Sequence, residues 1–202
     1  MGRLPVRFTA SLLSLLLVLA LPISAAAQSS GSEGGDCQMG ELDMSMADAT
    51  VSASSDTAAN KGLSAAEQRV RDLIREDGIH VVHLWAPWCG NSTRELANGW
   101  DELVRANEDV TFAFVTIWNG GADGQSTLQE YDLPERVVEL TQPGGTETNK
   151  ADRIESFLNL PVSWIPTTWI FHNNGELAFA MNYGEMQMDT LQLLIDLTRQ
   201  DW

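Results

Sequence analysis

The chain has 202 residues, which leaves room for one ordinary domain plus a leader or tail, because domains usually contain about 100–200 residues. Its formal net charge is −16, from 12 Lys and Arg against 28 Asp and Glu. This acidity argues against nucleic acid and against anionic membrane surfaces as partners, since both repel a negatively charged protein.

The first 27 residues have the three parts of a secretory signal peptide. Arg3 and Arg7 precede a run of apolar and small residues over 12–21, and the alanines at 25–27 supply a small-residue cleavage site. The strongly apolar part is about ten residues long, whereas a bilayer span needs about 20, so we expect cleavage near residue 27. The sequence therefore predicts an exported protein, periplasmic or otherwise extracytoplasmic, that keeps no stable membrane anchor.

Residues 28–61 are rich in Ser, Gly, Ala, Asp and Thr and almost lack large aliphatic side chains. Such a composition buries too little apolar surface to offset the entropy lost when the chain is ordered. We therefore expect a flexible low-complexity tether over 28–61 and one folded domain over 62–202.

The expected domain begins with alternating helix and strand patterns. A Ser-x-x-Glu capping box at 64–67 predicts a helix, and the apolar run 79–85 predicts a strand that is covered on both faces. Apolar residues at helical spacing over 91–107 predict a second helix, and 110–118 predicts a second buried strand.

A longer excursion over 119–160 follows, with Gly-rich turns, a short apolar stretch and a helix-like pattern at 154–158. Residues 167–172 and 177–183 then flank Asn-Asn-Gly, which predicts a hairpin because Asn and Gly accept positive φ angles. A closing helix is expected from about Asp189. The order of elements predicts the α/β class, with a central mixed β-sheet flanked by helices on both faces.

Two short motifs resemble a known family. Residues 85–92, Trp-Ala-Pro-Trp-Cys-Gly-Asn-Ser, lie between a predicted strand and a predicted helix, and resemble the active site of the thioredoxin superfamily. Residues 165–168, Ile-Pro-Thr-Thr, resemble the superfamily's cis-proline loop, and the excursion is similar to the insert of exported TlpA-type thiol-disulfide proteins. The resemblance covers residues 62–202 and implies a thioredoxin-like fold with an insert between the second core strand and the cis-proline strand.

By this resemblance, Cys89 is the nucleophile of thiol-disulfide exchange. A thiol at a helix N-terminus faces unpaired backbone N–H groups and the positive end of the helix dipole, and both favour the thiolate. Trp88, Gly90, Ile165 and Pro166 are the implied substrate-binding residues, because the backbone beside the cis proline can hold an extended peptide. The expected partners are protein or small-molecule thiols and disulfides, and no cofactor is expected.

Ser92 stands where the superfamily usually has its second cysteine. Cys89 therefore lacks a neighbouring thiol that could resolve a mixed disulfide, although Ser92 can donate a hydrogen bond to the thiolate. We expect monothiol exchange, meaning reduction with an external thiol, isomerisation or formation of a mixed disulfide. The alternative is a redox-inactive binding module or assembly factor that uses the same groove.

Cys37 is the only other cysteine, and it lies in the expected tether. Because the entropy of loop closure grows slowly with length, Cys37 could fold back and resolve Cys89; a free or intermolecularly paired thiol is the alternative. Cys37 with Met39, Met44 and Met46 also offers soft sulfur ligands for copper(I). Copper handling is a minor alternative, since no second cysteine or well-spaced histidine completes the set, and no metal site is predicted.

His83 occupies, by the resemblance, the position of a buried acid that often assists proton transfer in thioredoxins. An imidazole there could act as a base or stabilise the thiolate. The alternative is a core histidine whose hydrogen bonds are satisfied. Among the tryptophans, we expect Trp85, Trp88 and Trp164 to frame the active-site surface and Trp100 to lie in the core.

Overall fold

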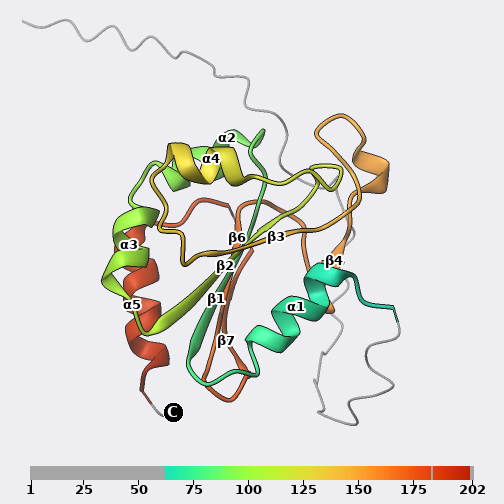
Figure 1. Ribbon diagram of the computed structural model, residues 1–202. Helices are drawn as coiled ribbons and strands as arrows, with labels where there is room; N and C mark the ends of the chain where they lie inside the picture. The colour runs from blue at the N-terminus through green and yellow to red at the C-terminus, as the bar shows by residue number, and fades with distance from the viewer. Residues whose placement is uncertain (1–61, 183, 201–202) are drawn as a thin grey trace, which may run out of the picture. The chain divides into compact units, whose positions relative to one another are not determined.

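The computed structural model describes residues 62–182 and 184–200. Its strands form a five-stranded mixed sheet, in which parallel β1 (Ile79–Trp85), β2 (Val110–Thr116) and β3 (Val138–Thr141) lie beside antiparallel β6 (Thr167–Phe171) and β7 (Leu177–Met181). The order across the sheet is β3-β2-β1-β6-β7 (Figure 1). With helices on both faces, this is the predicted thioredoxin-like fold. The expected signal peptide and tether, with Cys37 and the three methionines, lie outside the described residues.

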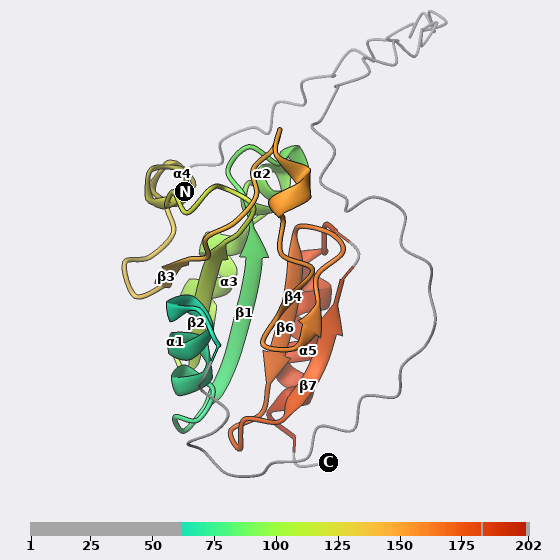
Figure 2. The ribbon, with the colours of Figure 1, turned by 90° about the vertical axis from the view of Figure 1, so that its right-hand side faces the viewer.

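Five α-helices surround the sheet: α1 (Ala65–Leu73), α2 (Gly90–Leu96), α3 (Trp100–Ala106), α4 (Gln125–Glu130) and α5 (Met188–Thr198). The predicted capping box opens α1, because the Ser64 hydroxyl accepts from the Glu67 backbone N–H at 3.1 Å and the Glu67 carboxylate accepts from the Ser64 N–H at 2.9 Å. Helix α1 covers one face of the sheet, and α3 and α5 cover the other (Figure 2). None of the helices in the described part is long and apolar enough to cross a membrane.

The single helix predicted over 91–107 is in fact two helices. Helix α2 ends at Leu96 and α3 begins at Trp100. Between them, Gly99 has φ 107°, a left-handed conformation that glycine adopts without steric penalty and that interrupts the helix. The apolar spacing continues across the break, which is why the sequence pattern indicated one helix.

The insert lies between β2 and β6, as predicted, but its structure differs in one place. A short 3-10 helix, η1 (Lys150–Asp152), precedes a two-stranded hairpin of β4 (Ser156–Phe157) and β5 (Leu160–Pro161). The helix-like pattern at 154–158 is therefore part of a hairpin. Its turn residues Leu158 and Asn159 have φ angles of 52° and 63°, which no right-handed helix allows.

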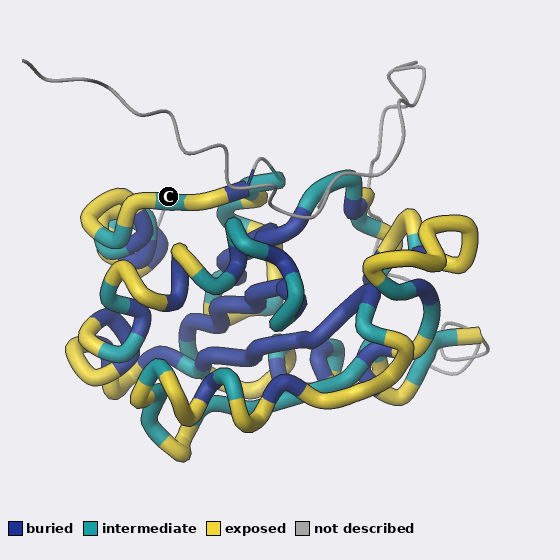
Figure 3. Tube along the Cα trace, turned by 90° about the horizontal axis from the view of Figure 1, so that it is seen from above, coloured by how far each residue is buried: buried dark blue, intermediate teal, exposed yellow. Residues whose placement is uncertain are grey.

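The sheet separates two clusters of buried apolar side chains. One cluster lies on the side of α1 and the β4–β5 hairpin and includes Val70, Leu84, Phe157 and Cys89. The other lies on the side of α3 and α5, and the central strands between the two clusters are buried along most of their length (Figure 3). Its members include Val81, Trp85, Leu96, Trp100, Leu103, Phe112, Phe114, Ile170, Leu191 and Ile195.

Candidate active site

Cys89 lies where the chain leaves β1 and enters α2. It is the N-cap residue of α2, with an extended backbone (φ −81°, ψ 114°), and its carbonyl accepts from the Thr93 N–H at 3.1 Å. The Cys89 N–H donates to the Ala86 carbonyl at 3.1 Å, which closes the turn after β1. The sequence thus places this sulfur at the start of a helix, and the side chain is fully buried.

The Cys89 sulfur is disulfide-bonded. Its Sγ lies 3.6 Å from the carbonyl oxygen of Ile165, and the Ile165–Pro166 peptide bond is cis, so the loop expected from the resemblance lies beside the sulfur. Both residues of that loop are buried. The other cysteine of the sequence, Cys37, lies outside the described residues.

Trp88, directly before Cys89, joins the site to the insert. Its indole N–H donates to the Trp118 carbonyl at 2.9 Å, and the Trp118 indole N–H donates to the Ile154 carbonyl at 3.0 Å. The Arg153 guanidinium lies against both rings, 5.0 Å from the Trp88 centroid and 4.9 Å from the Trp118 centroid. Sequence analysis missed Arg153, because nothing in the residue pattern of the insert points toward Cys89.

The other three tryptophans whose locations were predicted differ in how deeply they are buried. Trp85 is fully buried on the side of α3 and α5, so the expectation that it frames the active-site surface is wrong. Its ring packs on Gly124, where a Cβ atom would lie 2.3 Å from the indole. Trp164 is half-buried, and Trp100 is in the core as predicted.

Ser92 and Gly90 belong to the first turn of α2. The buried Ser92 hydroxyl accepts from the Ala86 backbone N–H at 3.4 Å, which ties α2 to the turn after β1. A hydrogen bond from Ser92 to a Cys89 thiolate stays a prediction for the reduced protein. Gly90 is half-buried at the first position of the helix.

His83 is fully buried and faces the side of the sheet opposite the Cys89 cluster. Its Nδ1 is 2.9 Å from the Thr168 hydroxyl, and its ring packs on Trp100 and Phe114 with centroid distances of 4.6 and 5.0 Å. Burial lowers the pKa of His83 to about 3, so the imidazole is neutral at physiological pH. His83 is thus a core residue, but its Nε2 has no hydrogen-bond partner among the described residues, so the expected satisfaction of its hydrogen bonds holds for Nδ1 alone. Proton transfer by His83 stays a prediction.

Glu95 is a second buried titratable residue, and sequence analysis missed it. It is on α2, and neither carboxyl oxygen has a hydrogen-bond partner among the described residues. Burial raises its pKa to about 8, and the charge of Glu185 adds to this rise. A glutamate on a short polar helix normally faces solvent, so no pattern indicated its burial.

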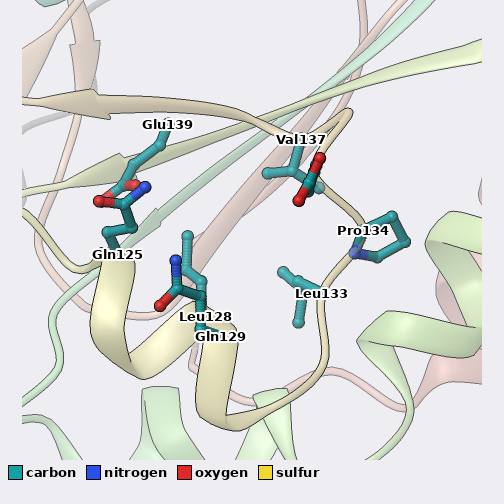
Figure 4. Close-up of a pocket in the computed structure, with 8 residues that line it drawn as sticks. Gln125, Leu128, Gln129, Leu133, Pro134, Val137 and Glu139 are labelled. Carbon is teal, nitrogen blue, oxygen red and sulfur yellow. The ribbon is translucent and has the colours of Figure 1, made fainter.

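One cavity in the described part of the chain is lined by none of these residues. It has a volume of about 320 Å³ and lies between α4 and β3 (Figure 4). Gln125 and Glu139 lie at one end and Leu133 and Pro134 at the other. It contains none of the predicted site residues. Within the described ranges, no group of three or more His, Cys, Asp or Glu side chains could hold a metal ion.

No protein-family model and no curated protein matches the chain. The chain is, however, similar to several solved structures. A secreted disulfide oxidoreductase of Mycobacterium tuberculosis, homologous to E. coli DsbE, is 22% identical with a TM-score of 0.46, over 61% of this chain and 84% of that one. StoA from Bacillus subtilis is 16% identical, with a TM-score of 0.40, over 59% and 83%. A DsbF homologue from Corynebacterium diphtheriae is 17% identical, with a TM-score of 0.44, over 61% and 73%.

Similarity at this level carries no conclusion about what this chain does. The fold assignment rests on the sheet order and on the position of Cys89 at the start of α2.

Proposed function

We propose that this chain is an exported thiol-disulfide exchange protein in which Cys89 is the exchanging cysteine. The observation that carries the proposal is the position of the Cys89 sulfur, which is disulfide-bonded and lies 3.6 Å from the Ile165 carbonyl, beside cis-Pro166. A backbone edge next to an exchanging sulfur can hold an extended peptide whose own cysteine is bonded to that sulfur. Trp88 and Gly90 border the same sulfur and complete the proposed substrate-binding set.

The proposed reaction has two exchange steps. In the first, the Cys89 thiolate attacks one sulfur of a client disulfide, a bond forms between Cys89 and that sulfur, and the other client sulfur leaves as a thiolate. In the second, another thiolate attacks the Cys89 sulfur and releases the first client sulfur. The client disulfide gains two electrons and becomes a dithiol, while the two attacking thiols become a disulfide.

Cys37 is the proposed source of the second thiolate. Ser92 has no sulfur to offer, and the disulfide bond recorded at Cys89 supports a second cysteine as its partner in the oxidised protein. In this scheme Cys37 lies outside the motif but in the same chain, and a small external thiol restores the two reduced cysteines. The reverse sequence would oxidise a client dithiol.

The signal-peptide pattern of residues 1–27 supports an extracytoplasmic location. Disulfides form and persist in such compartments, whereas cytosolic reductants keep most thiols reduced. The partners that follow from this proposal are protein or small-molecule thiols and disulfides.

One observation favours a second candidate function. Cys89 has no exposed surface in the oxidised structure, as expected for a structural crosslink in a redox-inactive binding module. A module of this kind would hold a partner through the same groove without exchanging disulfides.

Turnover of a peptide disulfide with an excess of a small thiol separates the two candidates. The wild-type protein should reduce the peptide, and Cys89→Ala should reduce it no faster than the thiol alone. In a separate reaction without the small thiol, reduced Cys37→Ala should accumulate a mixed disulfide between Cys89 and the peptide, which mass spectrometry detects as an added peptide mass. Absence of turnover, together with a reduced Cys89 that iodoacetamide modifies only after unfolding, would establish the binding module instead.

A further inference from the structure

A nearly buried arginine packs against the residue that precedes Cys89. Arg153 is 4% exposed, and its guanidinium stacks against Trp88, the residue that precedes Cys89, and against Trp118. Its Nε donates to the Thr146 carbonyl at 3.0 Å and its Nη2 to the Glu147 carbonyl at 3.1 Å. Two rings and two backbone carbonyls therefore fix the direction of a permanent positive charge beside the site.

The loop around Arg153 is built to accept this side chain. A Cβ atom on Gly145 would lie 2.6 Å from both Cα and Cγ of Arg153, so only glycine allows the loop to approach so closely. The Gly145 carbonyl accepts from the Gly120 N–H at 2.7 Å, which anchors the loop to the segment after β2. The charge is thus held by the insert and aimed at the region of Trp88.

We propose that Arg153 binds a carboxylate next to the cysteine that pairs with Cys89, and that its occupant in the oxidised protein is the chain's own acidic segment 33–43. This inference rests on the proposed pairing of Cys89 with Cys37. Segment 33–43 contains Cys37 and four acids but no Lys or Arg. The acids are Glu33, Asp36, Glu41 and Asp43.

Charge and geometry favour this occupant. The planar donors of a guanidinium match a carboxylate in two parallel hydrogen bonds, and such charge-assisted bonds are among the stronger ones in proteins. Asp36 directly precedes Cys37, so a disulfide to Cys89 would bring its carboxylate to within a few ångströms of the neighbourhood of Trp88. A separate acidic protein would be repelled by a chain of net charge −16, whereas a segment of the same chain is already attached.

The length of the intervening chain permits the contact. The roughly 25 residues between Cys37 and Gly62 span up to about 80 Å when extended, whereas a domain of this size has a radius of gyration of about 14 Å. Because the segment is covalently attached, its effective concentration at the site is high even for a weak charge pair. Arg153 would then select the resolving cysteine by the acid that precedes it.

The test is the redox equilibrium of the Cys37–Cys89 disulfide in the full chain, measured against glutathione buffers. Arg153→Met keeps an apolar stem between the rings but removes the charge, and we expect its disulfide to be reduced roughly tenfold more readily. Arg153→Lys should retain part of the wild-type equilibrium. Asp36→Asn should reproduce the Arg153→Met effect, and in the double variant the two effects should not add.

Arg136→Met is the matched control. Arg136 also lies over an aromatic ring, Phe112, and donates to backbone carbonyls, those of Val110 and Asn107, but it is on the other side of the sheet from Cys89. Its loss should leave the redox equilibrium unchanged. An equal shift in Arg136→Met, or additive effects of Arg153→Met and Asp36→Asn, would overturn the role of Arg153.

The same samples distinguish this inference from the proposed function. Failure of Cys37 and Cys89 to pair would overturn this inference and the role of Cys37 as the second thiol, whereas client turnover that depends on Cys89 would still support the exchange activity. Pairing without turnover of a client would refute the exchange activity, while a charge-dependent redox equilibrium would still support recognition by Arg153. Pairing that is insensitive to Arg153 and Asp36 would refute the recognition and leave the exchange activity standing.

Discussion

Two buried titratable side chains, His83 and Glu95, lie next to the same indole, that of Trp100. Burial lowers the pKa of His83 to about 3 and raises the pKa of Glu95 to about 8. Desolvation disfavours the charged form of each, so both are neutral near pH 7 although one is a base and the other an acid. The core beneath α2 therefore carries little charge at neutral pH. A pH above or below neutral should lower the free energy of unfolding.

Alkaline pH should lower the free energy of unfolding, because it favours ionisation of the buried Glu95 carboxyl. The unfolded chain ionises this carboxyl near pH 4.5 and the folded protein near pH 8, so the unfolded state binds fewer protons between these values. The free energy of unfolding should therefore fall, by up to about 1.4 kcal/mol per pH unit, as pH rises through this window. Urea unfolding of Glu95→Gln should lack this part of the slope.

The exposed Glu130→Gln is the control for that measurement, because it removes one carboxyl from the surface of α4. It should keep the slope of the wild type. Equal slopes in the wild type and Glu95→Gln would show that the Glu95 carboxyl reaches water or a hydrogen-bonding partner in solution.

Acidic pH should also lower the free energy of unfolding, in this case because it favours protonation of the buried His83 imidazole. Through His83, stability therefore falls as the pH falls. The unfolded chain protonates this imidazole near pH 6.5 and the folded protein near pH 3, so stability is lost as pH falls through this range. His83→Leu should flatten the dependence of unfolding free energy on pH below 6.5, whereas His172→Gln, at a half-exposed position, should not. The pH midpoint for alkylation of reduced Cys89 should not change in His83→Leu. A changed midpoint would restore the predicted role of His83 in proton transfer.

The sequence located Cys89 and the cis-proline loop beside it but not the residues that surround them. Cys89 and Pro166 lie in short contiguous motifs, so the resemblance of these motifs to the thioredoxin superfamily can be recognised in the sequence. Glu95 and Arg153 are charged residues in polar segments, and their burial depends on contacts with residues far along the chain. Patterns of hydrophobicity place such residues on the surface by default.

Among the elements, the strands were predicted better than the helices and the insert. A strand in the centre of this sheet is buried on both faces, which leaves the apolar runs seen in β1 and β2. The break before α3 and the β4–β5 hairpin depend instead on single residues with positive φ, namely Gly99, Leu158 and Asn159. Apolar spacing carries no information about such angles.

The close contact between Gly145 and Arg153 predicts what a larger residue at position 145 would do. Gly145→Ala places a Cβ atom 2.6 Å from Arg153 at a residue with φ 53°, so the loop must shift or the arginine must leave the indoles. We expect a loss of about 1–3 kcal/mol in unfolding free energy and, if Arg153 acts as proposed, a disulfide that is more readily reduced. Denaturant unfolding and the glutathione equilibrium measure the two effects.

Gly78→Ala is the matched control for that variant. Gly78 also has a positive φ, 119°, but a Cβ atom there meets its nearest neighbour at an ordinary 3.7 Å. It should lose stability through backbone strain without changing the redox equilibrium. Equal redox shifts in both variants would show that any loss of stability loosens the disulfide, whatever happens to Arg153.

At the scale of the whole molecule, the charge distribution sets which partners can approach. A net charge of −16 repels acidic proteins at distances up to about 8 Å, the Debye length at physiological salt. In the proposed pairing, the acidic segment 33–43 belongs to the same chain, so it would reach the charge of Arg153 at high effective concentration and would not have to overcome this repulsion by diffusion. The proposal therefore reconciles an acidic protein with recognition of an acidic cysteine-containing segment.

Pairing of Cys37 with Cys89 should also stabilise the whole domain. The disulfide closes a loop of about 50 residues, and the loss of unfolded-chain entropy for such a loop corresponds to about 4 kcal/mol. Oxidised wild-type protein should thus require more denaturant to unfold than Cys37→Ala, and reduced wild-type protein should match that variant. Mass spectrometry of the oxidised protein under non-reducing conditions should give the mass of one chain, whereas a doubled mass would indicate a disulfide between two molecules.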